Sequence, residues 1–395
     1  MRIATISRSA AALESLQRRQ SELSQAQLQM TGGLRVNRPS DDPTAMARAE
    51  RSRIVQSRNE SEQRSLGVSR SAMALTESSL GQGDSLMQSV RETLLAAGNG
   101  SYSAGERKAL AVQLTQLRSQ LLAVANQGDG AGGYVFGGQG TTAAPFLDGI
   151  GGVTFSGTGG QINASGPEQM PTTVDGRQIW LGVRSGNGVF ETAANPANTG
   201  AGWINAGSVT DPAALTGSSY EVVFAAGPTY SVLKDGLPTA LTALPFQSAL
   251  AVTVDGMSFS VSGQPAAGDR FSLVPSAPTL DPFKALDKAI AVMNNPNANV
   301  GQVAQAVALG VRDTDAVLSQ LQSARSVAGA TLNRLDAIEL RNADRTLWAK
   351  QVQSDAEDLD MVQAVSDFQN KQSGYQAALQ TYSIVQRMSL FDYLR

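Results

Sequence analysis

The stretch Leu332–Arg395, LNRLDAIELRNADRTLWAKQVQSDAEDLDMVQAVSDFQNKQSGYQAALQTYSIVQRMSLFDYLR, decides the fold. It contains no Pro and a single Gly, and it is rich in Leu, Gln, Ala, Glu and Arg, which favour helix. From Met361 onward, inner positions recur at alternating spacings of four and three residues, as in the seam of a coiled coil. The seam is imperfect, since two of these positions are Gln. A helix cannot bury such a stripe alone, so it needs a partner. The seam positions are Met361, Val365, Phe368, Gln372, Tyr375, Leu379, Tyr382 and Gln386.

A second weak seam of similar length lies at the start of the chain and also carries Gln at two inner positions. Two matching seams, one at each terminus, predict that the ends of the chain pair with each other. The alternative is that both are ordinary amphipathic helices of a bundle, each packing wherever it can. The N-terminal seam positions are Ile6, Ser9, Leu13, Leu16, Gln20, Leu23, Gln27, Met30 and Leu34.

The composition excludes several kinds of function. The chain has 395 residues, of which 16% are charged, and a net charge of −3, so no overall field favours nucleic acid or membrane. It has neither Cys nor His, which excludes disulfides, zinc sites with nitrogen or sulfur ligands, Cys nucleophiles and Ser-His-Asp triads. No apolar run is long enough to span a bilayer, and the N-terminus lacks a secretory apolar region. We therefore expect no cofactor and no metal.

Composition also divides the chain. Residues 1–127 and 280–395 read as helical, whereas residues 140–278 are rich in Gly, Thr, Ser, Pro and Val. This order predicts an α+β fold: an elongated, multi-domain helical and coiled-coil body built from both termini, with an inserted, mainly β domain. The expected boundaries are a coiled-coil helix at 1–35, helical parts at 36–142 and 280–361, the β insertion at 143–279, and a coiled-coil helix at 362–395.

A helix break is expected after Gly32-Gly33, because paired glycines end helices. Two Pro and two Asp follow closely, so the helix cannot continue, and Asp42-Pro43 should cap and begin the next one. The motif consists of Asn37, Arg38, Pro39, Ser40, Asp41, Asp42 and Pro43.

This NRPSDDP motif after a helix that ends in Gly resembles the flagellin family, the axial proteins of bacterial flagella. The segment Gly133–Gly138 with Pro145-Phe146, the start MRIAT and the ending MSLFDYL are similar to the family's junction subgroup of hook-associated proteins. The resemblance covers about the first 146 and the last 115 residues of the chain.

Charge is unevenly distributed between the two ends. Residues 2–70 hold twelve Arg, no Lys and seven acids, leaving +5, while residues 336–360 hold seven acids and three bases, leaving −4. No aromatic residue precedes Tyr102, so a basic arm that stacks on bases is disfavoured. We expect the two helical faces to pair with each other rather than with nucleic acid.

Other local signals place further elements. Ser103 and Glu106 form a capping box before a helix, and Asp281-Pro282 begins another. In the middle, residues 251–261 alternate around Asp255-Gly256 and predict a hairpin, as do residues 220–224 with 230–233. Residues 179–183 are expected to form a buried strand. Trp348 is interpreted as a core or subunit-contact anchor.

The resemblance implies a structural, non-enzymatic subunit of the hook–filament junction, secreted through the flagellar type III export apparatus. Its implied partners are copies of itself, hook-associated protein 1, flagellin and a cytoplasmic export chaperone. We expect the terminal helices to be disordered in the monomer and to fold on assembly. The expected assembly interface comprises Ile6, Leu13, Leu16, Leu23, Met30, Leu34, Val365, Phe368, Tyr375, Leu379 and Tyr382.

Two alternatives remain open at this point. One is flagellin itself, the bulk filament subunit. The other is an enzyme of the flagellar surface or cell wall with its site in residues 150–275, where paired carboxylates or a Ser-Lys arrangement would act. Lys234 is the one lysine in that region and so the one candidate base.

Overall fold

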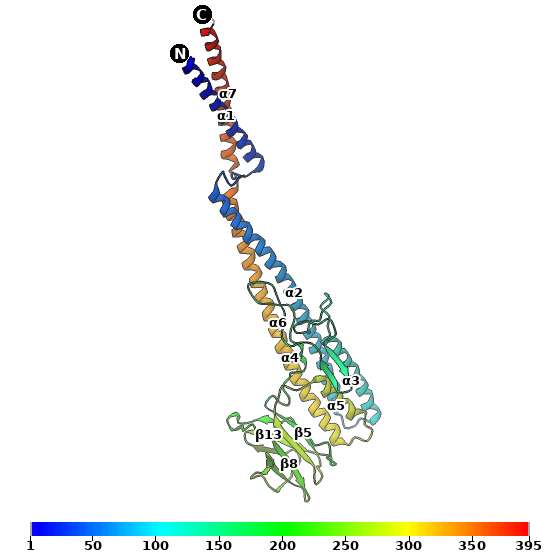
Figure 1. The fold of residues 1–395 in the computed structure, drawn as a ribbon. Helices are drawn as coiled ribbons and strands as arrows, with labels where there is room; N and C mark the ends of the chain where they lie inside the picture. The colour runs from blue at the N-terminus through cyan, green and yellow to red at the C-terminus, as the bar shows by residue number, and fades with distance from the viewer. Residues whose placement is uncertain (1, 394–395) are drawn as a thin grey trace. The chain divides into compact units, whose positions relative to one another are not determined.

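The computed structural model describes the backbone of residues 2–393 and the side chains of residues 10–384. The chain forms two compact units: residues up to 64 group with those from 338 onward, and residues 65–337 form the other. Long helices occupy both ends of the chain and strands occupy its middle, so the predicted α+β class is confirmed (Figure 1). Within the described residues, no helix has the length and apolar character needed to span a membrane.

The first unit contains α1 (Arg2–Gly32), the beginning of α2 (Pro43–Ala97), the end of α6 (Val300–Glu357) and α7 (Met361–Tyr393). The predicted break is confirmed: α1 ends at Gly32, Gly33 takes a φ of +66°, and α2 begins at Pro43. A second break, between α6 and α7, divides the C-terminal stretch at 358–360.

The second unit has a helical body made of α2, α3 (Ala104–Ala125), α5 (Pro282–Asn294) and α6. Both predicted helix starts are confirmed. Ser103 forms a capping box with Glu106, and the Asp281 carboxylate accepts from the backbone N–H of Phe283 and Lys284. The shared core is apolar and fully buried; its members include Leu80, Met87, Leu94, Leu114, Leu121, Phe283, Leu286 and Leu321.

The expected strand at 179–183 is wrong, because Gly176–Trp180 forms a short helix, α4. Asp175 caps it by accepting from the N–H of Gln178. Trp180 is fully buried and meets Phe136 edge to face, with ring centroids 5.6 Å apart. An apolar run of this length fits a buried helix as well as a strand, and the cap decides between them.

The β domain contains two sheets with one core between them. One has the order β10-β9-β8-β14-β5 with β11 also on β9, and the other has the order β12-β13-β6 with β7 also on β13. Both predicted hairpins are confirmed, as β8–β9 and β12–β13. The strands are β5 (Phe190–Ala194), β6 (Trp203–Ile204), β7 (Ser208–Val209), β8 (Tyr220–Ala225), β9 (Thr229–Lys234), β10 (Leu237–Pro238), β11 (Leu244–Pro245), β12 (Ala251–Val254), β13 (Met257–Ser262) and β14 (Arg270–Pro275).

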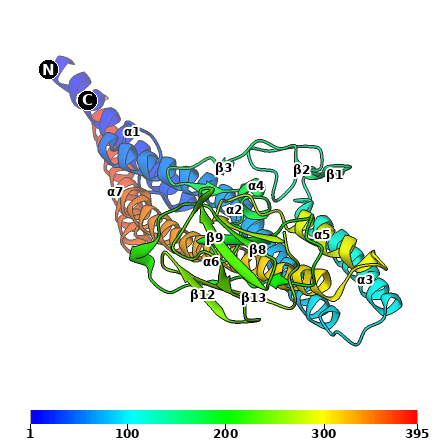
Figure 2. The same cartoon turned by 90° about the horizontal axis from the view of Figure 1, so that it is seen from below.

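Two further hairpins belong to the helical body rather than to this domain. They are β1 (Phe146–Gly149) with β2 (Gly152–Phe155), and β3 (Asn163–Ala164) with β4 (Met170–Pro171). Figure 2 shows β1 and β2 apart from the β domain strands. Phe146 and Val153 of this hairpin are buried in the helical core.

Polar contacts fasten the β domain to α6. The buried Gln305 amide accepts from the N–H of Ile204 at 2.8 Å and donates to its carbonyl at 3.2 Å. Arg312 donates to the Thr192 carbonyl at 2.8 Å. Thr192 lies in β5, which is the edge strand of its sheet. These bonds satisfy buried backbone groups that would otherwise be unpaired.

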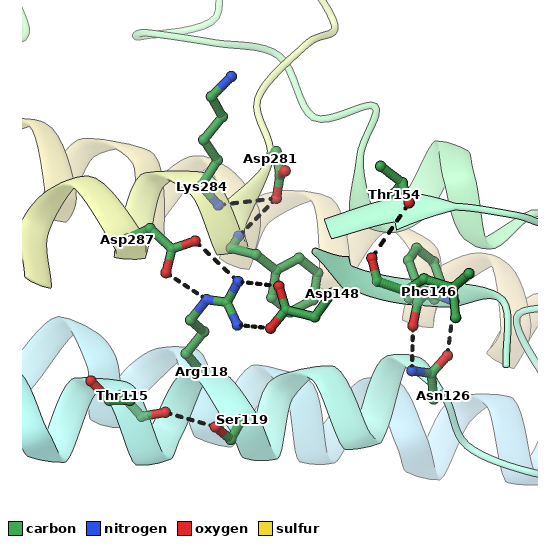
Figure 3. A network of polar contacts seen from close by, with 12 residues as sticks. Thr115, Arg118, Ser119, Asn126, Phe146, Asp148, Thr154, Asp281, Lys284 and Asp287 are labelled. Atoms are coloured by element: carbon green, nitrogen blue, oxygen red, sulfur yellow. Dashed lines mark hydrogen bonds and ion pairs between the residues drawn. The ribbon is translucent and has the colours of Figure 1, made fainter. Parts of the chain in front are cut away.

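A buried guanidinium fastens the β1–β2 hairpin to α3 and α5 (Figure 3). Arg118 donates to both carboxylate oxygens of Asp148, at 2.6 and 2.9 Å, and its Nη2 donates to Asp287 at 3.0 Å. Its charge also lies 5.8 Å from the centre of the Phe283 ring. Such a bidentate, charge-assisted contact fixes orientation as well as adding stability. The hydrogen bond from Arg118 lowers the pKa of Asp148 below its usual range.

Two glycines in α2 give a matched test of packing. A Cβ at Gly83 would lie 2.9 Å from the buried Trp180 ring, whereas a Cβ at Gly67 would meet nothing within 4 Å. We expect Gly67→Ala to raise the free energy of unfolding by about 0.5–1 kcal/mol, because alanine is the better helix former. Gly83→Ala should lower it, because the ring cannot move out of a filled core. Chemical denaturation measures both, and a gain at Gly83 would contradict the packing described.

The Arg118–Asp148 pair predicts a dependence of stability on pH. Since the folded-state pKa of Asp148 is lowered, its stabilisation is present above the unfolded pKa and is lost as the pH falls through the folded value. Asp148→Asn should therefore flatten the loss of stability below about pH 4 relative to the wild-type chain. Arg118→Ala should lower the free energy of unfolding at pH 7 by about 1–3 kcal/mol. Denaturation series at pH 3 to 7 test this, and parallel curves for wild type and Asp148→Asn would contradict it.

Candidate assembly interface

The terminal helices α1 and α7 lie side by side in the first unit and run in opposite directions (Figure 1). The contact is thin, because few of the described side chains in it are buried. Leu16 and Ala26 on α1 and Ala364 on α7 are less than a tenth exposed. At Gly374, a Cβ would lie 2.8 Å from a guanidinium nitrogen of Arg19, so the helices approach closely there.

The predicted interface residues with described side chains divide into three groups by their exposure. Leu16 is buried, and the side chain of Ile6 lies outside the described residues. Half-buried positions are Leu23, Met30, Leu34, Phe368, Tyr375 and Tyr382. The exposed ones are Leu13, Val365 and Leu379, with 48%, 39% and 43% of their surfaces in solvent. A single chain thus leaves part of its own apolar seam uncovered.

The two helix breaks of this unit are joined by backbone hydrogen bonds. The N–H of Leu359 donates to the Gly33 carbonyl at 3.0 Å, and the N–H of Arg35 donates to the Glu357 carbonyl at 2.7 Å. The Arg35 guanidinium also donates to the Ala356 carbonyl at 2.7 Å. These bonds satisfy carbonyls at the end of α6 that have no partner within the helix.

The NRPSDDP motif shapes the turn next to these bonds. Asp41 accepts from the N–H of Asn37 at 3.2 Å and of Arg38 at 3.0 Å, which folds the motif back on itself. Asp42 accepts from the N–H of Ala45 at 2.9 Å and so caps α2. That hydrogen bond is the main cause that lowers the pKa of Asp42. The motif therefore acts as a turn and a helix cap, as its residues predict.

The partner loop at 356–360 was not identified from the sequence as part of the site. Glu357 is 4% exposed and receives a hydrogen bond of 2.6 Å from Arg53 on α2. The available signal was Asp360 before Met361, since its carboxylate accepts from the N–H of Val362 at 3.0 Å and begins α7.

Helices α2 and α6 pair through polar groups in this unit. Gln56 donates to Gln353 at 2.6 Å, and Gln63 donates to Glu339 at 3.2 Å. The predicted pairing of oppositely charged helices is present at Arg53–Glu357 here and at Arg70–Asp336 in the second unit. Small buried side chains complete the contact between α2 and α6: Ala45, Ala49, Ala349 and Ala356.

The β domain holds the residues of the alternative enzymatic reading. Lys234 donates to Asp255 at 2.6 Å, and this bond raises its pKa, so the lysine is a cation and a poor base. Asp255 also accepts from the Tyr220 hydroxyl. The carboxylate of Asp269 accepts backbone N–H groups in a turn, and those of Asp175 and Asp211 do so at helix starts. These acids act in local structure.

Comparison with known proteins finds similarity to flagellar proteins. Residues 3–141 match the bacterial flagellin N-terminal helical region. Flagellar hook-associated protein 3 of Escherichia coli is 25% identical over 368 residues, which cover 92% of this chain and 90% of that protein. The flagellar junction protein FlgL of Legionella pneumophila superposes with a TM-score of 0.67 at 27% identity, over 79% of this chain and 100% of that one. The chain is thus similar to proteins of the flagellin family, over its N-terminal third to the family's helical region and over most of its length to hook-associated protein 3.

A flagellin is similar over a smaller part of the chain. Flagellin FlaB1 of Treponema pallidum is 33% identical over 99 residues, which are 25% of this chain and 34% of that protein. By contrast, the similarity to hook-associated protein 3 covers 92% of this chain and 90% of that protein. Among flagellin-family proteins, the chain is thus similar along nearly its whole length to the junction type.

The exposed part of the terminal seam generates a prediction about assembly. Leu379→Asp should block incorporation into flagella, because it places a charge in a surface that other copies would cover. Gln380→Asp is the matched control: it adds the same charge at the next position of α7, which is exposed and off the seam. Both variants should retain a folded second unit, measured by circular dichroism and thermal unfolding. Normal incorporation of Leu379→Asp would show that this seam is not the interface.

Proposed function

We propose that this chain is a structural subunit of the junction between the hook and the filament of the bacterial flagellum. The observation that carries the proposal is the similarity to hook-associated protein 3 over 92% of this chain and 90% of that protein. The similarity favours the junction over the filament, because the flagellin match covers a quarter of the chain. No catalytic step is part of the proposed role.

The terminal helices serve as the means of assembly in this proposal. Copies of the chain pack through the seams of α1 and α7 into a ring or tube, covering Leu13, Val365 and Leu379. Because few side chains of the α1–α7 pair are buried in one chain, its helices are marginal before assembly and become ordered within it. Strong protection of residues 13–30 and 368–382 from amide exchange in the monomer would contradict this.

The neighbours in the axis complete the proposal. Hook-associated protein 1 lies on the hook side and flagellin on the filament side. The chain leaves the cell through the flagellar type III apparatus, and a cytoplasmic chaperone holds its C-terminal segment before export. Helices without a settled partner suit passage through a narrow channel.

Immunogold labelling of intact flagella tests the location. With an antibody raised against the β domain, residues 190–275, we expect a narrow band at the base of each filament. Label along the whole filament would make the chain a flagellin, and label confined to the cell body would overturn the flagellar role.

A further inference from the structure

Two exposed helix faces in the first unit carry complementary side chains. The face of α2 presents Arg48, Arg51 and Arg58 around the apolar pair Ile54 and Val55, all of them exposed. At about 100° per residue these five positions lie within one third of the helix circumference. On the helical wheel the face lies beside the row of buried α2 residues that includes Ala45, Ser52 and Asn59.

The face of α6 has the opposite charge and a larger apolar centre. Leu347 and Trp348 expose 70% and 66% of their surfaces, and Leu340 exposes 69%. Asp344 lies three residues before Leu347, and Asp355 lies seven residues after Trp348. An exposed tryptophan beside two exposed leucines is unusual on a surface that stays in water, and Trp with Arg is typical of the centre of interfaces.

Of these charged residues, Arg58 alone forms an ion pair within the part of the chain whose side chains are described. Among residues with described side chains, Arg48, Arg51 and Asp344 form no ion pair. Arg58 contacts Glu62 at 3.5 Å, with 74% of its own side chain exposed. Asp355 accepts from Gln351 on its own helix at 2.8 Å.

We propose that the α2 face of one copy docks on the α6 face of a second copy standing beside it, with the helices antiparallel. The spacing on the two helices matches in that direction. Arg58 and Arg48 are ten residues apart, and Asp344 and Asp355 are eleven apart, which correspond to about 15 and about 16 Å.

Between these charged ends, the apolar residues meet in the same register. Val55 and Ile54 lie three and four residues from Arg58, just as Leu347 and Trp348 lie three and four residues from Asp344. Arg51 then reaches the level of Gln351 and the Trp348 ring, where a cation–π contact is available.

The register also fixes the level of the two copies. Within one chain, Gln56 bonds to Gln353 and Gln63 bonds to Glu339, so α2 and α6 already run antiparallel. Pairing Arg58 with Asp344 of the neighbouring copy aligns α2 and α6 in nearly the same register as within one chain. The two copies therefore stand at nearly the same level along the helix axes. Because the two faces belong to different helices, each copy uses one face on each side, and the contact repeats from copy to copy. The inference rests on the proposed function, since it names how neighbours in that assembly meet.

Charge reversal tests the contact in the full chain. Arg48→Glu with Arg58→Glu should reduce the amount of protein recovered in purified flagella at least tenfold. Adding Asp344→Arg and Asp355→Arg to the same chain should restore it, because every copy then carries both reversed faces. Lys350→Glu on α6 and Arg64→Glu on α2 are controls, since these exposed residues lie off the two faces.

Cross-linking tests the same contact without changing charge. The chain has no Cys, so Val55→Cys and Leu347→Cys each introduce one thiol. Flagella that contain both variants should give a cross-linked dimer with a short bis-maleimide, and flagella that contain either variant alone should give none.

The outcomes separate this inference from the proposed function. If wild-type protein is absent from the junction by immunogold, the proposed function fails. If the wild type is present there, yet the reversed variant incorporates normally or the mixed dimer is missing, the docking of these two faces is wrong. A dimer from one single-thiol variant alone would also overturn it, because it would mean that like faces meet.

Discussion

The first unit depends on the hydrogen bonds that join its two helix breaks. The chain must leave α1 and begin α2 at residues 33–42, and must leave α6 and begin α7 at 358–360. Each break exposes backbone groups that have no partner within a helix. Bonding Gly33 and Arg35 to Leu359 and Glu357 satisfies groups at both breaks together. One break without the other would leave those groups unpaired, so the two are kept in register.

The rest of the chain is fastened by a different means. In the second unit, buried polar groups reach across elements and end on backbone carbonyls or carboxylates. Gln305 and Arg312 fasten the β domain to α6, and Arg118 fastens the β1–β2 hairpin to α3 and α5. Each bond specifies one position for its element, because a shift would leave a buried polar group without a hydrogen-bond partner. The apolar cores of the helical body and of the β domain supply bulk stability, while these bonds supply the geometry.

Local signals in the sequence were sufficient for most elements. Caps at Asp42, Ser103 and Asp281 and the Asp255-Gly256 turn each placed an element boundary correctly, because capping and turn chemistry involve residues close in sequence. The expected strand at Ile179–Val183 was wrong, since an apolar run of that length does not distinguish strand from buried helix.

The partner of the chain segment at Gly33 and Arg35, next to the NRPSDDP motif, could not be found in this way. Glu357 and Leu359 lie more than 300 residues beyond it, and they contribute backbone groups that no residue type signals. The placement of Leu13 and Leu379 at the surface was equally invisible, because a heptad pattern does not state which partner covers each position.

The grouping of residues up to 64 with those from 338 onward has a consequence for the order of events during synthesis. The ribosome makes the N-terminal half of this unit first and its partner last, whereas residues 65–337 are complete earlier. The second unit can therefore fold while the first 64 residues still lack the segment from residue 338 onward with which they pack. Contacts of such long sequence separation form slowly. The nascent protein thus spends most of its synthesis with its N-terminal region accessible to other molecules.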